Sequence, residues 1–259
     1  MDKFFWTKIN TIAFNVWRES IRDKAVTILI SAFTIILLFF HIMGSISVNG
    51  DRLIQTSGLY IFGIFGVLVN IYLSVSFMQE INAKRFYIIL VRPVSTFQFL
   101  AGKYIGMCML LLTLFLLMSL IWFLFILSNS FIQLTYLHAL TLFFIFAEWT
   151  IIAAASVCFA LFTNPLLQSL IVVSLYFFGH HSNDIYLYAQ TKVHILTKQI
   201  LMGLYYSIPN LELMNFRTIM LYGGDVEFKQ ILSALMIALL WIAVFFTASC
   251  TLFAKKRFA

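Results

Sequence analysis

Long apolar stretches alternate with short polar ones along the chain, and this pattern predicts a bundle of membrane-spanning helices. A helix needs roughly 20 residues to cross about 30 Å of hydrocarbon. Transmembrane β-barrels instead show alternating segments of about ten residues, a pattern that the sequence lacks. The fifth stretch is the shortest and needs neighbouring residues to span fully. The six stretches cover residues 25–43, 56–78, 101–127, 136–162, 166–178 and 231–253.

Residues 1–24, which precede the first apolar stretch, have the pattern of an amphipathic helix. At 100° per residue, the apolar side chains fall on one arc and the basic and amide side chains on the other. A helix of this kind lies in the plane of a membrane interface. We therefore expect an N-terminal interfacial helix. The apolar arc contains Phe5, Ile9, Ile12, Ala13, Val16 and, at its edge, Trp17.

The non-spanning segment before the last span, residues 182–228, is too apolar for a free loop. Within residues 193–206 the apolar positions recur at helical spacing. The Ile208-Pro209-Asn210 sequence then ends that pattern. We expect one or two short helices that lie on, or dip into, the outer leaflet of the membrane.

Composition supports a membrane protein with a single domain, residues 1–259. Apolar residues make up 62% of the chain and charged residues 10%, whereas soluble domains have roughly 25% charged residues. No room remains for a separate soluble catalytic domain. The three cysteines lie inside apolar stretches, so no disulfide framework is expected. The first apolar stretch exceeds the 7–15 residues of a signal-peptide core, and we expect it to be retained.

The distribution of Lys and Arg predicts the orientation of the chain. If the N-terminus is inside, twelve of the 17 basic residues lie on the inner side. Five lie on the outer side and are matched by five acids there: Arg52, Lys192, Lys198, Arg217 and Lys229, with Asp51, Asp184, Glu212, Asp225 and Glu227. The positive-inside rule then places both termini and residues 79–100 in the cytoplasm. The net charge of +7 therefore reflects membrane orientation, and no nucleic-acid partner is expected.

Residues 79–100 are the one long polar interruption in the first half of the chain. They contain Glu80, Lys84, Arg85 and Arg92 around the apolar turn 86–91. Pro93 should end a short helix near Arg92, because proline disfavours helix at the preceding residue. A short cationic helix between two membrane spans is suited to docking a cytosolic partner.

The same residues resemble the cytoplasmic loop of type-2 ABC transporter (ABC-2) permeases, in particular those of the nitrous-oxide-reductase-maturation type. Thr96 departs from the family pattern, which often has a basic residue directly after Val-Ser. The residues that carry the resemblance are Glu80, Lys84-Arg85, Arg92-Pro93-Val94-Ser95, Leu100-Ala-Gly-Lys103, Tyr176-Phe-Phe-Gly-His180 and Ser207-Ile-Pro-Asn210.

This resemblance implies a six-span permease subunit of an ATP-driven exporter in the cytoplasmic (inner) membrane of a prokaryote. Such a permease pairs with a second copy or a homologous permease, and each permease binds a cytosolic ABC ATPase that holds ATP and Mg. Residues 79–100 correspond to the coupling helix, which is seated in a cleft of the ATPase. The expected ATPase-coupling residues are Glu80, Lys84, Arg85, Arg92 and Pro93.

The chain itself is not expected to bind ATP or another cofactor, or to be an enzyme. Gly102-Lys103 is the one Gly-Lys pair, and a Walker A loop would need Gly at Phe97 and Ser or Thr at Tyr104. ATP hydrolysis is therefore expected in a separate chain. No serine nucleophile elbow or His-Glu-x-x-His motif is present, so no catalytic residues are predicted.

Glu148 lies near the middle of the fourth apolar stretch, where a carboxylate is energetically expensive. It is a candidate for the translocation path or for a gating contact. Alternatively, it is protonated, or hydrogen-bonded to Ser or Thr of a neighbouring span, or it lies at a dimer interface. His180, His181 and Asp184 cluster at the end of the fifth stretch, with His194 nearby. Adjacent histidines point in different directions on a helix, so no metal site is expected.

Other interpretations remain open from the sequence. The chain could be a non-transporting membrane anchor or a sensory subunit of an ATPase complex. Less favoured are an ion-coupled secondary transporter and an intramembrane enzyme that uses Glu148 and a histidine. Gly102 and Gly106 form a small-xxx-small pair, which would let the third span approach a neighbour closely.

Overall fold

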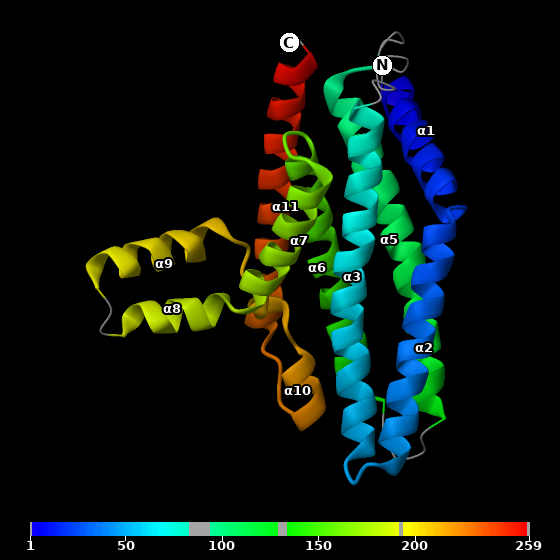
Figure 1. Cartoon of the computed structure of the whole chain (residues 1–259), viewed down its shortest axis with the longest axis vertical. Helices are drawn as coiled ribbons and strands as arrows, with labels where there is room; N and C mark the ends of the chain where they lie inside the picture. Colours follow the sequence, from blue (N-terminus) through cyan, green and yellow to red (C-terminus); the bar gives the residue numbers. More distant parts are fainter. Residues whose placement is uncertain (1, 83–93, 129–133, 192–193, 258–259) are drawn as a thin grey trace.

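The structure, a computed structural model, describes residues 2–82, 94–128, 134–191 and 194–257. Within these ranges all regular structure is helical (Figure 1). The helices are α1 (Asp2–Ile21), α2 (Lys24–Ile46), α3 (Gly50–Asn82), α5 (Thr96–Leu127), α6 (Tyr136–Ala160), α7 (Pro165–His180), α8 (Ser182–Gln190), α9 (Ile195–Ser207), the 3₁₀ turn η1 (Glu212–Met214), α10 (Arg217–Tyr222) and α11 (Phe228–Arg257).

Five helices in the described part of the chain are long and apolar enough to cross a membrane, namely α2, α3, α5, α6 and α11. They coincide with five of the six predicted spans. The remaining predicted span coincides with α7, which has 16 residues and a length of about 24 Å. That length is less than the thickness of the hydrocarbon core. The prediction of a polytopic helical membrane protein is therefore confirmed, and a sixth crossing is not.

The centre of the bundle is formed by α3 and α6, which pack against each other. One apolar cluster joins α3 to α2, α5 and α6, and a second joins α6 to α7, η1 and α11. The outer helices expose large apolar side chains, for example Ile35 and Phe39 on α2 and Leu239 and Leu240 on α11. Such extensive exposed apolar surface is typical of contact with lipid.

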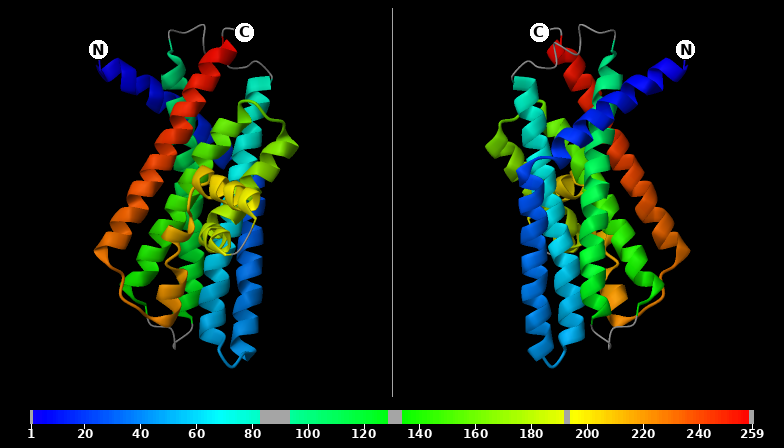
Figure 2. Two further views of the ribbon diagram at one scale, coloured as in Figure 1. Left: turned by 90° about the vertical axis from the view of Figure 1, so that its left-hand side faces the viewer. Right: turned by 90° about the vertical axis from the view of Figure 1, so that its right-hand side faces the viewer.

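Both chain termini lie at one end of the bundle, as do the end of α3 and the start of α5 (Figures 1 and 2). There α1 packs closely on α5, because Gly102 and Gly106 leave room for it. A Cβ atom on Gly106 would lie 2.7 Å from the Ala13 carbonyl oxygen. The apolar arc predicted to face lipid is thus used in part against protein, with Ile9 and Ala13 buried on α5.

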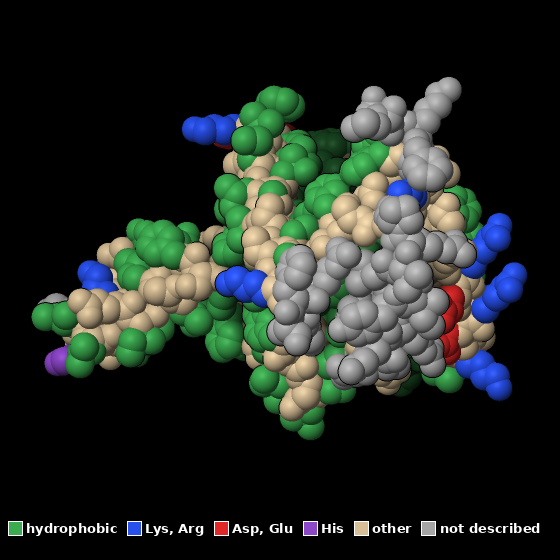
Figure 3. All heavy atoms as spheres, turned by 90° about the horizontal axis from the view of Figure 1, so that it is seen from above, with side chains coloured by type: hydrophobic (Ala, Val, Ile, Leu, Met, Phe, Trp, Pro, Cys, Tyr) green, Lys and Arg blue, Asp and Glu red, His purple; other side chains and the backbone are tan. Residues whose placement is uncertain are grey.

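At the same end, an ion pair joins α3 to α5. The buried Lys103 ammonium contacts the carboxylate of Glu80. Ser95 and Gln98 form a capping box that begins α5. Seen from this end, Lys and Arg side chains stand at the rim of the molecule (Figure 3). The predicted coupling helix lies outside the described residues, as do Lys84, Arg85, Arg92 and Pro93.

The segment 182–228 contains more structure than the sequence predicted. It forms α8, α9, η1 and α10, where one or two short helices were expected. Helices α8 and α9 pack together as a hairpin that projects sideways from the bundle (Figure 1). The following residues turn back into the bundle, where Leu211, Met214 and Phe216 are buried against α6 and α11. This return brings polar residues of the segment next to α6.

Candidate functional site

A buried ion pair joins the middle of α6 to the start of α10. The Arg217 guanidinium donates two hydrogen bonds to the Glu148 carboxylate, with Nη2–Oε2 and Nη1–Oε1 distances of 3.0 and 3.4 Å. Glu148 is fully buried and Arg217 is 1% exposed. Two-pronged contact of this kind fixes the planes of both groups. The ion pair therefore ties the 182–228 segment to the centre of the bundle.

Apolar packing and backbone hydrogen bonds place Arg217. The Phe216 ring contacts Phe144 of α6 at a centroid distance of 4.7 Å, so the side chain before Arg217 is anchored on the helix that carries Glu148. The Leu211 N–H donates to the Gly179 carbonyl of α7. The Asn215 Oδ1 accepts from Arg217 Nη1 at 3.2 Å. The Arg217 guanidinium is thus held by Glu148 of α6 and by Asn215 of its own chain segment.

His180, at the end of α7, lies between two carboxylates. Its Nε2 is 3.4 Å from Glu148 Oε2, and its Nδ1 is 3.8 Å from Glu212 Oε2. The Asn215 amide donates to both oxygens of Glu212. One continuous polar cluster consequently runs from Arg217 and Glu148 through His180 to Glu212 and Asn215. We call these five residues the α6–α10 cluster.

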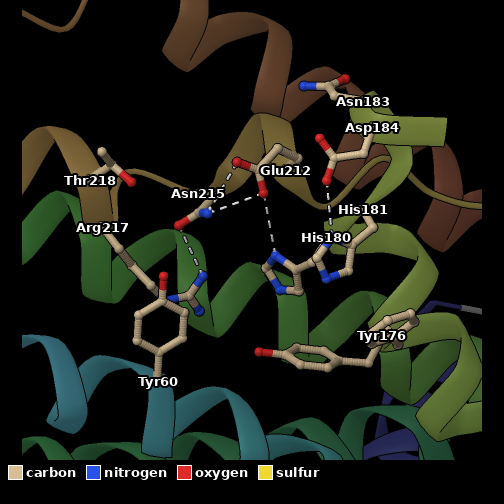
Figure 4. A pocket seen from close by; sticks show the side chains of 11 residues that line it. Tyr60, Tyr176, His180, His181, Asn183, Asp184, Glu212, Asn215, Arg217 and Thr218 are labelled. Atoms are coloured by element: carbon tan, nitrogen blue, oxygen red, sulfur yellow. Dashed lines mark hydrogen bonds and ion pairs between the residues drawn. The ribbon is translucent and has the colours of Figure 1, made fainter. Parts of the chain in front are cut away.

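A cavity of about 570 Å³ lies beside the α6–α10 cluster. Tyr60 of α3 and Tyr176 of α7 form part of its wall, and their side chains converge with those of His180 and Arg217 (Figure 4). The volume is within the range of about 300–1,000 Å³ of ordinary small-molecule sites. The full lining is Tyr60, Tyr176, Phe177, His180, His181, Asn183, Asp184, Glu212, Asn215, Arg217 and Thr218.

The close approach of Tyr176 to α3 depends on Gly63. A Cβ atom at residue 63 would lie 2.0 Å from the Tyr176 hydroxyl oxygen and 3.7 Å from Arg217 Nη2. Any larger side chain would displace the tyrosine from the cavity wall. The Arg217 guanidinium also lies over the Tyr60 ring, 5.8 Å from its centroid. The α3 surface is therefore shaped to accept α7 and α10 at this level.

Glu148 was predicted as an exceptional intramembrane carboxylate, and the structure gives it a partner that the sequence analysis did not identify. The expected alternatives were protonation, a Ser or Thr hydrogen bond, or a dimer contact. Arg217 had been assigned to the outer side, among charges balanced by local acids. The signal was present, because an ionised group buried in a bundle needs an opposite charge. Among the five basic residues assigned outside, the sequence alone did not identify which one turns inward.

The histidine cluster separates as its helical positions require. His180 faces the α6–α10 cluster, whereas His181 contacts the exposed Asp184, with an Nδ1–Oδ2 distance of 3.0 Å. Within the described ranges, no group of three or more His, Cys, Asp or Glu side chains is arranged to hold a metal ion. Of the predicted ATPase-coupling residues, only Glu80 is described, and it is paired with Lys103.

Comparison of the sequence with known protein families finds no match, and comparison with curated proteins finds none either.

Proposed function

We propose that the chain is the permease subunit of an ATP-driven exporter, in which a separate cytosolic ABC ATPase acts on residues 79–100. A second copy of the chain, or a homologous permease, completes the transporter in the cytoplasmic membrane of a prokaryote. The proposal includes a sixth crossing that α7 begins and that adjoining residues complete. The observation that carries the proposal is the way the two ends of the coupling segment are joined.

The segment leaves the bundle at the end of α3 and re-enters it at the start of α5. Just inside these two points, Glu80 and Lys103 form their ion pair. Helix α1 packs on the same stretch of α5, around Gly102 and Gly106. A force applied to the segment therefore acts on α1, α3 and α5 together. This arrangement suits a surface through which a motor protein moves several spans.

In the α6–α10 cluster, we propose that the Glu148–Arg217 ion pair is a gate. It joins the 182–228 segment to α6 beside a polar cavity. Separating the pair would let α10 and the cavity wall move away from α6. A ligand or a nucleotide state can shift that equilibrium only if it favours one of the two arrangements.

The test of ATPase coupling reverses two charges in the segment, as Arg85→Glu with Arg92→Glu. The double variant and its partner ATPase are co-expressed, purified together and assayed for hydrolysis. We expect loss of co-purification or of permease-stimulated hydrolysis. The matched control is Lys198→Glu with Lys229→Glu, which makes the same charge change at two exposed residues in or after the 182–228 segment. Unchanged association and turnover in the Arg85/Arg92 variant would refute the docking proposal.

One observation favours a second candidate, a proton-coupled secondary transporter. Glu148, His180 and Glu212 form a chain of titratable groups between the bundle centre and a cavity. Such chains serve as proton relays in pumps and transporters. The two candidates differ in their energy source. Uptake or efflux by reconstituted protein without an ATPase, driven by a pH gradient alone, would support the second candidate over the first.

A further inference from the structure

The charges around the cavity are unequal. Among the described residues that line it, Arg217 is the one guanidinium or ammonium, and its charge is already matched by Glu148. Two further carboxylates, Asp184 and Glu212, also line the cavity. With neutral histidines the group thus carries two uncompensated negative charges. With either His180 or His181 protonated, one remains, and with both protonated none remains.

These carboxylates are accessible to a ligand. The side chain of Asp184 is 75% exposed and that of Glu212 is 35% exposed. The contacts of Glu212 are the neutral Asn215 amide and the more distant His180. Neither contact brings a permanent positive charge to the Glu212 carboxylate. An ammonium group in the cavity would supply it.

The rest of the wall is aromatic. Tyr60, Tyr176 and Phe177 line the cavity beside the carboxylates, and the Phe177 side chain is largely exposed. Aromatic faces attract cations within about 6 Å of the ring centroid. Carboxylates and aromatic rings together form a site that prefers an organic cation to a hydrated metal ion. The absence of a metal-ligand set among the described residues agrees with that preference.

One buried donor at the wall also lacks a partner. Arg217 is 1% exposed, and its Nε–H has no hydrogen-bond partner among the described residues. Unpaired buried donors are uncommon and destabilising. A hydrogen-bond acceptor on a bound ligand would satisfy this donor.

We propose that the cavity between α3, α7 and α10 binds organic monocations, an ammonium or similar charged centre with an aromatic or aliphatic body. The charge lies near Glu212 and Asp184, and the apolar body contacts Tyr60, Tyr176 and Phe177. Binding requires this chain alone and no ATPase. That the bound cation is the exported substrate rests on the function proposed above.

The experiment compares two ions of nearly equal shape and opposite charge, tetraphenylphosphonium and tetraphenylborate. Equilibrium binding of each is measured on the purified full chain in lipid nanodiscs, after subtraction of binding to empty nanodiscs. We expect saturable binding of the cation and none of the anion. The Asp184→Asn, Glu212→Gln double variant should raise the Kd of the cation by at least about tenfold.

The matched control is Asp225→Asn with Glu227→Gln, which removes two exposed carboxylates from the same segment but outside the cavity lining. It should leave the Kd unchanged. Gly63→Leu provides a second test, because displacement of Tyr176 should weaken cation binding while all carboxylates remain. Thermal unfolding of each variant verifies that it is folded.

Three results would overturn the proposal: no saturable cation binding, equal binding of the anion, or a Kd unaffected by loss of Asp184 and Glu212. The assay contains no ATPase. Cation binding without ATP-dependent export of the cation would therefore refute its role as the exported substrate and leave the site intact. Export without cation binding would refute the cation site and leave the exporter proposal intact.

Discussion

Breaking the Glu148–Arg217 ion pair should show how much of the fold depends on it. Removing one partner leaves an uncompensated buried charge, which costs about 3–5 kcal/mol. The two single variants should differ. Arginine does not lose its proton in proteins, so Glu148→Gln leaves a permanent buried cation and should cost about 5 kcal/mol. Arg217→Met leaves a carboxylate that can take up a proton, so about 3 kcal/mol is expected.

The double variant Glu148→Gln, Arg217→Met removes both charges. Neutral replacement of a buried ion pair is often close to neutral for stability. We therefore expect the double variant to lose less than about 2 kcal/mol, which gives a coupling energy of about 6 kcal/mol or more between the two residues. His180 moderates the Arg217→Met cost, because its Nε2 lies 3.4 Å from the remaining carboxylate.

Equilibrium unfolding in mixed detergent micelles, followed by tryptophan fluorescence, measures these values. The chain has five tryptophans, of which Trp149 is fully buried and adjacent to Glu148, so their combined emission follows unfolding of the bundle. Asp184→Asn serves as the control, because an exposed ion pair contributes only about 0–1 kcal/mol. If each single variant lost less than about 1 kcal/mol of unfolding free energy, and the two losses simply added in the double variant, the view that this pair holds α10 to α6 would be refuted. Transport by Glu148→Gln must be compared at equal amounts of folded protein.

Four further predictions concern residues outside the α6–α10 cluster. Gly106→Ala should loosen α1 from α5 at a cost of about 1–3 kcal/mol, seen as faster proteolysis of α1. Gly203→Ala on α9, where a Cβ meets nothing within 4 Å, should instead stabilise by up to about 1 kcal/mol. Hydrogen bonds from Tyr72 and the Ala25 N–H lower the pKa of Asp23. The contribution of the Asp23 carboxylate to the stability of the folded state is therefore present at neutral pH and is lost as pH falls below about 4. An unfolding series of Asp23→Asn against pH should lack that acid-side loss. Glu80→Gln with Lys103→Met should preserve ATPase co-purification but lower stimulated hydrolysis, since docking remains while the link between α3 and α5 is removed.

The membrane-spanning helices were predictable because their signal is local. A run of apolar residues long enough to cross hydrocarbon can be read directly from the sequence, and each predicted stretch contains a helix. The turn before α7 was equally local: the Asn164 side chain accepts from the Leu167 N–H and Pro165 occupies the first turn. Signals of this kind need no knowledge of what lies across the bundle.

The contacts around the predicted residues come from distant parts of the sequence. Glu148 and Arg217 are 69 positions apart, and no periodicity joins them. The role of the α1 arc was ambiguous for a different reason. Lipid and protein interior are similarly apolar, so one amphipathic pattern fits either environment. The small residues Gly102 and Gly106 correctly predicted a close approach, but the sequence did not specify that α1 would fill it.

The short length of α7 explains why a polar site exists at this depth. Glu148 lies 12 residues before the end of α6, or about 18 Å along the helix. Helix α7 starts just beyond that end, packs against α6, and ends at His180 after about 24 Å. Its end is therefore nearly level with Glu148, and the following segment leaves the bundle there. One or two further turns in α7 would carry Glu212 and Arg217 beyond the level of Glu148 and leave that carboxylate without a cation. The length of α7, which falls short of a full crossing, is thus the condition for both the ion pair and the cavity.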